Sequence, residues 1–221
     1  MRRTALVLAL GLAPLLLAES SRAGAAPICG GNLPLDRTQH VTLDARAYDL
    51  AIHPNGNYVV GLSSGVATID ACRLIAIGRC ADDDGAYSLR VLGDGSVEYV
   101  TREGVVRACE PVTGESRSSS ASAQREHAAV RVEGEQAFLG DRRAPLRGSD
   151  GALDSDVSRD GARAAVSLRD GSVLVYSVAS AMPIERYRAH SRNAYAVRFD
   201  GVRGRIVTVG GEGELGIRRA R

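Results

Sequence analysis

The four histidines are the residues of this chain best suited to metal or acid–base chemistry, but their spacing forms no site along the sequence. They are His40, His53, His127 and His190. Structural zinc sites usually separate paired ligands by two to four residues, and no two histidines or cysteines here have that separation. We therefore expect no metal ion and no cofactor. We expect His190 to fix a loop through a hydrogen bond.

Two groups of aspartates resemble the carboxylate ligands of calcium sites. Asp154, Asp156 and Asp160 are spaced like half of a calcium loop, but Arg159 stands at the sixth position, where glycine is required. We expect these three residues in a strand and a turn. Residues 82–84 are three adjacent aspartates, which repel one another, so we expect a solvated turn; a weak calcium site is the alternative.

The sequence indicates no catalytic residue. Serine is common in the expected loops, and we propose no Ser-His-Asp triad. The carboxylate pairs of glycoside hydrolases form in space, so an enzyme with such a pair stays an alternative. Binding of sugars by aromatic stacking is disfavoured, because the chain has no tryptophan and only 4% aromatic residues.

The N-terminal residues 1–25 have the pattern of a cleaved secretory signal peptide. Arg2 and Arg3 precede an apolar run at 5–18, and small residues at 23–25 offer a cleavage site. The alternative is a transmembrane anchor, but the run is shorter than the roughly 20 apolar residues that span a bilayer. We expect a secreted or periplasmic protein without a membrane span, whose single domain covers residues 26–221.

All four cysteines follow the signal peptide, which favours two disulfides in an oxidising compartment. They are Cys29, Cys72, Cys80 and Cys109. Three pairings are open. Cys72 and Cys109 end equivalent strands of the repeats described below, so a bridge between neighbouring repeats through these two residues is one hypothesis.

The charge of the mature chain argues against some partners. Without residues 1–25 the chain has 25 basic and 25 acidic residues, and every basic residue is arginine. Proteins that bind nucleic acids usually carry a basic stripe, which a neutral chain does not predict. We therefore expect no nucleic acid, and the charged rim described below favours a protein or peptide partner.

Short strands must position any site in this chain. Asp160-Gly161 and Asp170-Gly171 separate apolar runs, and Asp-Gly between such runs is a strong signal for a β-hairpin. The run 172–178 is apolar on both faces, which predicts a strand that is covered on both sides.

The hairpin signals repeat along the chain. The dipeptides Ser64-Gly65, Glu103-Gly104, Asp170-Gly171 and Glu212-Gly213 each precede an expected third strand. Their glycines are 39, 67 and 42 residues apart. Two of these intervals fit the blade of a β-propeller, which has about 40–45 residues and four strands. The longer interval holds a serine-rich loop at 116–122 and a shortened unit.

The best repeat resembles the WD-repeat family of β-propellers. Residues 158–161 match the Ser-Pro-Asp-Gly type of turn of that family, and His190 precedes Ala194, Val197 and Phe199 at the family's spacing. Tyr176-Ser177 stands where the family has Trp-Asp. The resemblance implies a propeller fold and a binding role. It is clear only from 149 to 221, and no unit has the family's full set of His, Asp, Ser and Trp.

The fold that we expect is an all-β, small β-propeller of four to five four-stranded blades, closed by an N-terminal strand. The expected units are about 45–80, 85–122, 127–148, 149–190 and 191–221. The last unit offers only three strands, so we expect residues 38–43 to supply its fourth and to cover an exposed edge.

The candidate binding face lies at the end of the propeller that carries the turns between second and third strands. Its expected residues are Arg102, Glu103, Arg169, Asp170, His190, Arg192 and Glu212. This charged rim favours an exported, non-catalytic scaffold that contacts proteins, although a merely solvated face is an equal alternative. A propeller-type hydrolase or lyase with a site in the central channel is the second class. A third is an incomplete propeller that pairs with another copy or another protein.

Overall fold

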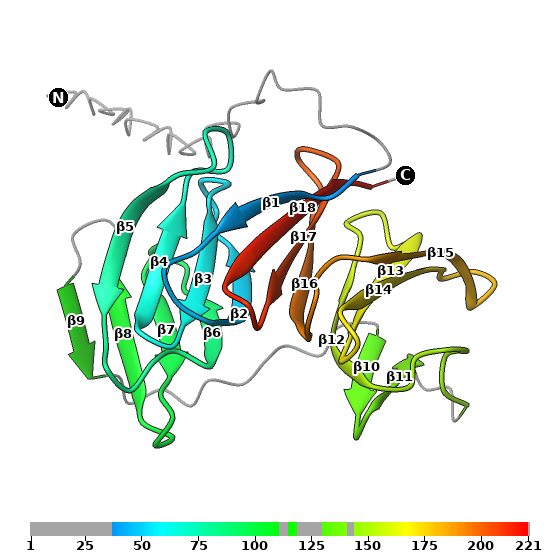
Figure 1. Ribbon diagram of the computed structural model, residues 1–221, viewed down its shortest axis with the longest axis horizontal. Coiled ribbons are helices and arrows are strands. Elements are labelled where there is room, and N and C mark those ends of the chain that lie inside the picture. Colours follow the sequence, from blue (N-terminus) through cyan, green and yellow to red (C-terminus); the bar gives the residue numbers. More distant parts are fainter. Residues whose placement is uncertain (1–36, 111–114, 119–129, 141–143, 221) are drawn as a thin grey trace, which may run out of the picture.

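A computed structural model describes residues 37–110, 115–118, 130–140 and 144–220. The expected signal peptide, Cys29 and His127 lie outside these residues. The described residues form eighteen strands and no helix (Figure 1). The strands are β1 (Gln39–Thr42), β2 (Ala47–Ile52), β3 (Tyr58–Leu62), β4 (Gly65–Ile69), β5 (Ala76–Ala81), β6 (Ser88–Val91), β7 (Val97–Val100), β8 (Val106–Glu110), β9 (Glu115–Ser118), β10 (Val130–Glu133), β11 (Gln136–Leu139), β12 (Ala152–Val157), β13 (Arg163–Leu168), β14 (Ser172–Ser177), β15 (Met182–Arg188), β16 (Ala194–Asp200), β17 (Arg205–Gly210) and β18 (Glu214–Arg219).

The strands pair as antiparallel sheets, mostly between chain neighbours. Four sheets have four strands each, in the orders β2-β3-β4-β5, β6-β7-β8-β9, β12-β13-β14-β15 and β1-β18-β17-β16. A fifth sheet within the described residues has only β10 and β11. Consecutive pairing follows from the tight turns, because a short connection can join only antiparallel neighbours.

The last sheet is completed from the other end of the chain, as predicted for residues 38–43. Strand β1 pairs antiparallel with β18, and His40 lies opposite Gly216. Figure 1 shows β1 in blue beside β18 in red. Val41 and Leu43 pack against the buried core next to this sheet. The pairing hides the free edge that three strands alone would expose.

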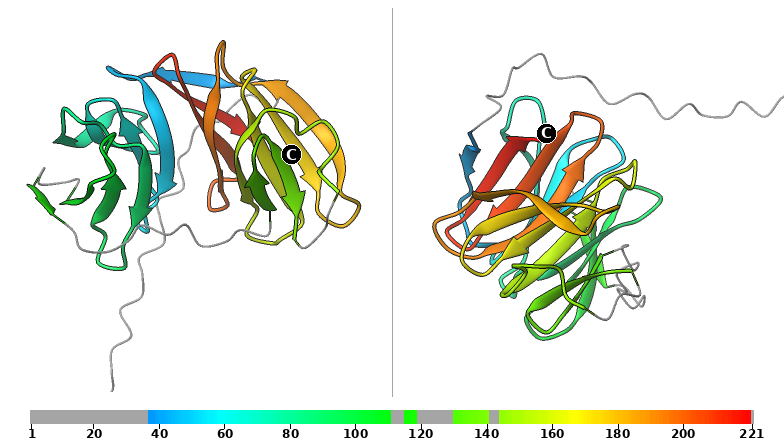
Figure 2. Two further views of the ribbon diagram at one scale, coloured as in Figure 1. Left: turned by 90° about the horizontal axis from the view of Figure 1, so that it is seen from below. Right: turned by 90° about the vertical axis from the view of Figure 1, so that its right-hand side faces the viewer.

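The sheets stand side by side in an arc, each with its first strand toward the middle. These first strands neighbour one another in the order β10, β12, β16, β2 and β6. Figure 2 shows the sheets turning about a common centre, with β6–β9 at one end of the arc and β10–β11 at the other. Apolar clusters fill the spaces between neighbouring sheets.

The central strands are apolar on both faces, as predicted for the run from Ser172. All five residues of β3 and of β4 are buried, as are the first five of β14. The turn before β14 requires its glycine. Gly171 has a φ of 85°, and a Cβ there would lie 2.2 Å from the carbonyl oxygens of His190 and Arg192. This hairpin therefore packs closely on the loop after β15.

The disulfide bond in the described region corrects the hypothesis about cysteine pairing. Cys80 on β5 is bonded to Cys109 on β8, so the bridge does link neighbouring sheets, but Cys72 is not the partner of Cys109. Cys72 is itself disulfide-bonded. The predicted pairing was wrong because Cys80, on the outer strand of one sheet, packs in the same buried cluster as Cys109 on β8 of the next sheet. The bond fits an oxidising compartment.

The aspartates at 82–84 do not form the fully solvated turn that was expected. Asp82 is buried, and its Oδ2 accepts hydrogen bonds of 2.7 Å from the Tyr99 hydroxyl and from Arg107 Nη1. Arg107 also reaches Asp84. A cation and a hydroxyl thus offset the repulsion that favoured full solvation in the sequence argument. Asp154 and Asp156 lie in β12 and Asp160 in the following turn, as expected.

Candidate binding pocket and histidine corner

Three tyrosines occupy equivalent positions where first strands begin. Tyr48 and Tyr195 each lie at an irregularity in strand pairing, between Ala47 and Asp49 and between Ala194 and Ala196. Such a bulge leaves a residue without a partner opposite it and turns its side chain away from the regular alternation. Tyr87 directly precedes β6, and its N–H donates to the Val100 carbonyl at 2.9 Å.

The three rings meet because their strands are neighbours in the arc. The rings of Tyr48 and Tyr87 stack, with centroids 4.4 Å apart and planes 28° apart. The ring of Tyr195 lies 5.6 Å from Tyr48, at 53°. Offset aromatic contacts of this kind are favourable and rigid. The result is a half-buried aromatic surface that joins three sheets.

Two arginines stand beside this aromatic surface and line a cavity of about 350 Å³. We call this site the tyrosine pocket, and its residues are Arg46, Tyr48, Arg192, Asn193, Tyr195 and Gly211. Arg46 and Arg192 are exposed. No carboxylate of the described residues forms an ion pair with either guanidinium. The pocket therefore combines aromatic faces with two cations that have no acidic partner within the described part of the chain.

The pKa of Tyr48 is raised. Burial is the largest cause, and the neighbouring Tyr87 hydroxyl adds to it, whereas Arg46 acts in the opposite direction. Tyr48 thus stays protonated at neutral pH and keeps an O–H donor in the pocket. A site with guanidinium, hydroxyl and amide donors is suited to a ligand rich in acceptor oxygens.

The loop that carries Arg192 and Asn193 is held by His190, in the role predicted for it. Nε2 of His190 lies 2.8 Å from the Thr208 hydroxyl, and Nδ1 lies 3.2 Å from Glu212 Oε1. The same Glu212 oxygen accepts the Ser191 N–H at 2.9 Å. These contacts join the loop after β15 to β17 and to the turn that follows β17.

Burial keeps His190 neutral. It lowers the pKa of His190 to about 4, against the opposing attraction of Glu212. Burial by itself would raise the pKa of Glu212, but its backbone hydrogen bonds and His190 outweigh burial and lower that pKa. Because the carboxylate can only accept, Nδ1 of His190 carries the proton and Nε2 accepts from the Thr208 hydroxyl.

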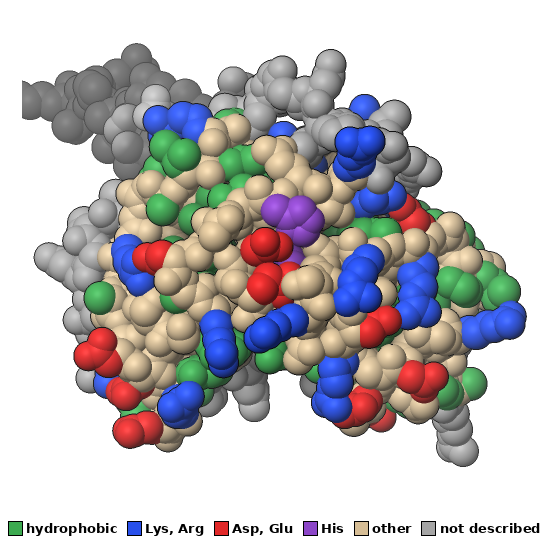
Figure 3. Space-filling view, viewed as in Figure 1, with side chains coloured by type: hydrophobic (Ala, Val, Ile, Leu, Met, Phe, Trp, Pro, Cys, Tyr) green, Lys and Arg blue, Asp and Glu red, His purple; other side chains and the backbone are tan. Residues whose placement is uncertain are grey.

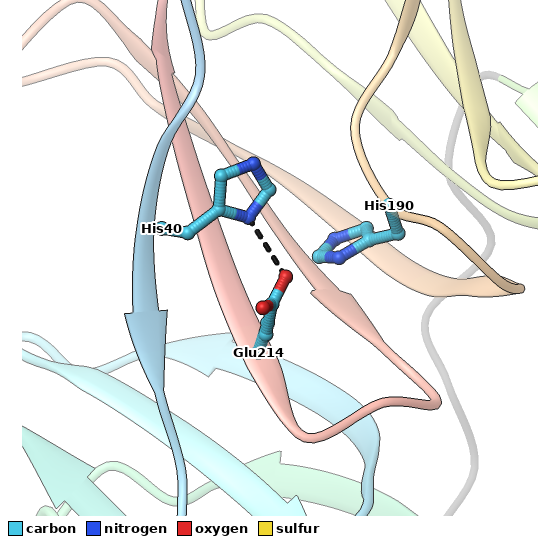
Figure 4. Close-up of side chains that lie close together, drawn as sticks. All are labelled: His40, His190 and Glu214. Carbon is cyan, nitrogen blue, oxygen red and sulfur yellow. Dashed lines mark ion pairs between the residues drawn. The ribbon is translucent and has the colours of Figure 1, made fainter.

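A second histidine reaches this place from the N-terminal strand. His40 Nδ1 lies 3.0 Å from Glu214 Oε2, and the rings of His40 and His190 meet edge to face with centroids 5.9 Å apart. Figure 4 shows His40, His190 and Glu214 converging from β1, from the loop after β15 and from β18. We call His40, His190, Thr208, Glu212 and Glu214 the histidine corner. In Figure 3 histidine side chains lie at the middle of one face, with acidic side chains directly beside them and basic ones around them.

Carboxylates on the first strands form a third group, near the centre of the arc. Arg198 on β16 pairs with Asp154 on β12 and, at 3.4 Å, with Asp49 on β2. Asp49 also accepts the Leu89 N–H at 2.7 Å, and Asp156 accepts the Phe199 N–H at 2.7 Å. Burial raises the pKa of Asp156. These contacts link neighbouring sheets, so they position the strands.

The residues of the expected binding face fall into different places. Arg192 lines the tyrosine pocket, and His190 and Glu212 belong to the histidine corner. Asp170 pairs with Arg186, and Arg169 pairs with Glu135 at 2.5 Å. Arg102 and Glu103 are exposed on the turn between β7 and β8. Neither Arg102 nor Glu103 lines the tyrosine pocket.

The tyrosine pocket was not predicted, although the chain carries a signal for it. Ala47-Tyr48-Asp49-Leu50, Ala86-Tyr87-Ser88-Leu89 and Ala194-Tyr195-Ala196-Val197 repeat an Ala-Tyr-x-aliphatic pattern at the start of first strands. A comparison of first strands would have aligned these tyrosines. Their convergence depends on the order of the sheets, which the pattern does not contain.

The chain also contains one motif that resembles the nucleophile motif of serine hydrolases. Residues 61–65 have the spacing Gly-x-Ser-x-Gly, with Ser63 at its centre. In hydrolases this motif forms a sharp turn from a strand into a helix. Here Ser63 lies in the turn of the β3–β4 hairpin. The motif therefore has the wrong local structure for a nucleophile.

Comparisons with known proteins give no family. No protein-family model and no curated protein match the chain. Among solved structures, the computationally designed Ika8 protein is similar over 78% of this chain and 45% of its own length, with 14% identity and a TM-score of 0.31. The chain thus spans less than half of that protein. No helix among the described residues is long and apolar enough to cross a membrane.

Proposed function

We propose that this protein is an exported, non-catalytic binding module with a diverged, WD-like β-propeller fold. Its tyrosine pocket binds an acidic segment of a partner protein. The observation that carries the proposal is the pairing of two exposed arginines, free of acidic partners among the described residues, with a tyrosine surface around one cavity. The repeated four-stranded sheets and their inward first strands support the propeller.

The chemistry of the pocket favours a carboxylate next to an apolar or aromatic group. Arginine presents a planar fork of donors that matches a carboxylate in geometry. Tyrosine and arginine are also enriched among the residues that dominate the energy of protein interfaces. Because the three rings are already in contact, the pocket loses little side-chain entropy when a ligand binds.

Selection from a displayed library of random peptides tests this function. We expect the selected peptides to combine Asp or Glu with an aromatic or aliphatic residue, and their binding to weaken as salt rises. For one selected peptide, fluorescence anisotropy should show at least tenfold weaker binding to the Arg192→Gln variant. Cross-linking in the native cells would then search for proteins that contain such segments.

A matched control shows whether the selected peptide binds to the pocket or is attracted by positive charge alone. Arg102 is an exposed arginine in the turn between β7 and β8 and does not line the pocket, so Arg102→Gln removes the same charge from another part of the surface. We expect the control to bind like the unaltered protein. Equal weakening by both variants, or selected peptides without acidic residues, would contradict the proposal.

A propeller-type hydrolase or lyase is the second candidate, because carboxylates do converge on the first strands. The specific observation is Asp156, whose raised pKa would suit a general acid. Its Oδ2, however, is bound to the Phe199 N–H, and Arg198 neutralises the neighbouring Asp154. Turnover of a panel of glycoside and polyuronide substrates that is abolished by Asp156→Asn would favour this candidate over the binding module.

A further inference from the structure

The histidine corner has the composition and geometry of a metal site. We propose that His40, His190 and Glu214 bind one Zn²⁺ ion, and that this ion fastens strand β1 to the remainder of the fold. The site is independent of the tyrosine pocket and of the proposed function. It is invisible in the sequence, because its ligands come from β1, the loop after β15 and the start of β18.

Strand register brings the ligands to one face of the sheet. His40, Gly216 and Thr208 lie in a row across β1, β18 and β17. Glu214 is two residues before Gly216, so it points to the same face. A side chain at Gly216 would meet the Thr208 hydroxyl at 2.7 Å and His190 Cε1 at 3.4 Å. The absence of a side chain there leaves the space in which the two imidazoles meet.

The distances are close to those of a coordinated ion. One ligand atom from each of the three residues lies within 4.8 Å of the other two. His40 Nδ1 and Glu214 Oε2 are 3.0 Å apart. Ligands about 2.0–2.1 Å from a tetrahedral zinc are separated by about 3.3 Å. His40 and Glu214 have side chains that are 39% and 34% exposed, so small rotations can bring them to the fixed ring of His190.

His190 is prepared for this role by Glu212. Histidines that bind metals usually donate the N–H of their other nitrogen to a carboxylate, which fixes the tautomer and orients the ring. Glu212 accepts from Nδ1 in this way, so Nε2 presents a lone pair. In this structure the Thr208 hydroxyl lies 2.8 Å from Nε2 and donates to this lone pair. The same hydroxyl has another possible acceptor, the Gly216 carbonyl, at 3.4 Å. A metal can therefore displace the hydroxyl without leaving it unbonded.

The donor set favours zinc over calcium or magnesium. Two imidazole nitrogens with one carboxylate form a donor set that suits Zn²⁺, whereas calcium and magnesium prefer six or more oxygens. The neighbouring Glu212 adds negative charge, and its Oε2 is buried without a hydrogen-bond partner among the described residues. Three protein ligands leave the fourth position of zinc to water.

The ion would stabilise the one strand that joins the two ends of the chain. Within the described residues β1 has four residues and pairs only with β18. A metal that bridges β1, β18 and the loop after β15 would hold this strand on a second side. Binding to the folded protein alone raises its stability by mass action.

Isothermal titration of the oxidised, tag-free mature protein with ZnCl₂ tests the site. We expect one equivalent of Zn²⁺ to bind, an excess of Ca²⁺ not to compete, and Co²⁺ to give the visible absorption of a tetrahedral complex. Zn²⁺ at 100 times its Kd should raise the melting temperature by about 5–10 °C. His40→Gln and Glu214→Gln should each weaken binding at least tenfold and abolish most of the thermal shift.

Matched controls separate this site from adventitious binding. His53→Gln and Glu103→Gln remove a histidine and a glutamate elsewhere, and both should bind Zn²⁺ like the unaltered protein. The decisive variants concern partly exposed side chains, so each should fold without metal; His190→Gln is not needed for the decision. Failure to bind one equivalent, or equal effects of the control and site variants, would overturn the proposal, whatever the result of the peptide selection.

Discussion

The histidine corner and the tyrosine pocket share the loop after β15, yet they are built in opposite ways. His190 is buried and both of its ring nitrogens have partners, whereas Arg192, two residues later, is exposed and has no acidic partner among the described residues. The corner fixes the backbone of the loop. The pocket presents side chains from that fixed backbone. Changes in the corner should therefore affect stability, whereas changes in the pocket should affect peptide binding and leave stability unchanged.

The largest loss of stability is expected when strand β1, which carries His40 of the corner, is removed. A chain that begins at Asp44 loses β1, and with it Val41 and Leu43 from the core beside β18. We expect a loss of about 3 kcal/mol or more, because two half-buried aliphatic side chains and the pairing with β18 are lost together, and one fully buried large side chain alone is worth about 2–5 kcal/mol. Cooperative thermal unfolding, followed by circular dichroism, should be lost.

The matched control for this truncation is a chain that begins at Arg37, which keeps β1. It should melt in one cooperative transition. Identical melting of the two chains would show that β1 contributes nothing to the stability of the fold. The contacts of His40 in the corner would then not stabilise the protein.

The stability of the protein should decrease at acid pH because His190 is buried in its neutral form. The pKa of His190 is lowered to about 4 in the folded protein, from an ordinary value near 6.5. The unfolded chain then binds more protons, so the stability that depends on neutral His190 is complete above pH 6.5 and declines as pH falls toward 4. We expect a decrease of up to about 3 kcal/mol over this range. Urea unfolding at pH 7.5, 5.5 and 4.5 measures it.

The variant His190→Gln isolates this contribution from the titration of other groups. Its stability should depend less steeply on pH between 6.5 and 4.5 than that of the unaltered protein. Parallel curves for the two proteins would mean that His190 does not titrate in this range on unfolding.

At pH 7.5 the same His190→Gln substitution should cost about 2 kcal/mol. Glutamine cannot reach both Thr208 and Glu212 in the geometry of the ring, and a buried polar group that loses its partner costs about 1–3 kcal/mol. His53→Gln is the comparison, because His53 is only half-buried and bonds the Gly95 carbonyl at 2.9 Å. We expect less than 1 kcal/mol there. A smaller loss for His190 than for His53 would reverse the roles given to these histidines.

The smallest effect on stability is expected in the pocket. Arg192→Gln should change the free energy of unfolding by less than about 0.5 kcal/mol, as is usual for exposed residues without structural contacts. A loss of more than 1 kcal/mol would show that Arg192 supports the loop, and the contrast between corner and pocket would fail.

The sequence by itself determined the strands that flank tight turns and the closing strand. Asp-Gly turns and alternating or fully apolar runs define strands locally, because they depend on φ and on a two-residue period. A last unit with only three strands implied that residues 38–43 would pair with it, and β1 does pair with β18. The role of His190 in fixing its loop was also within reach, from its place before a first strand.

Tertiary structure decided which distant residues meet. Cys80 pairs with Cys109 because β5 and β8 share a core cluster, and Asp82 is buried because Tyr99 and Arg107 reach it. The tyrosine pocket and the contact of His40 with Glu214 depend on the order of the sheets around the arc and on the register of β1. A local pattern contains the type of each side chain and its face, but the sheet order and the register result from the packing of the whole chain. Chemistry that is scattered along this sequence is therefore gathered only by the fold.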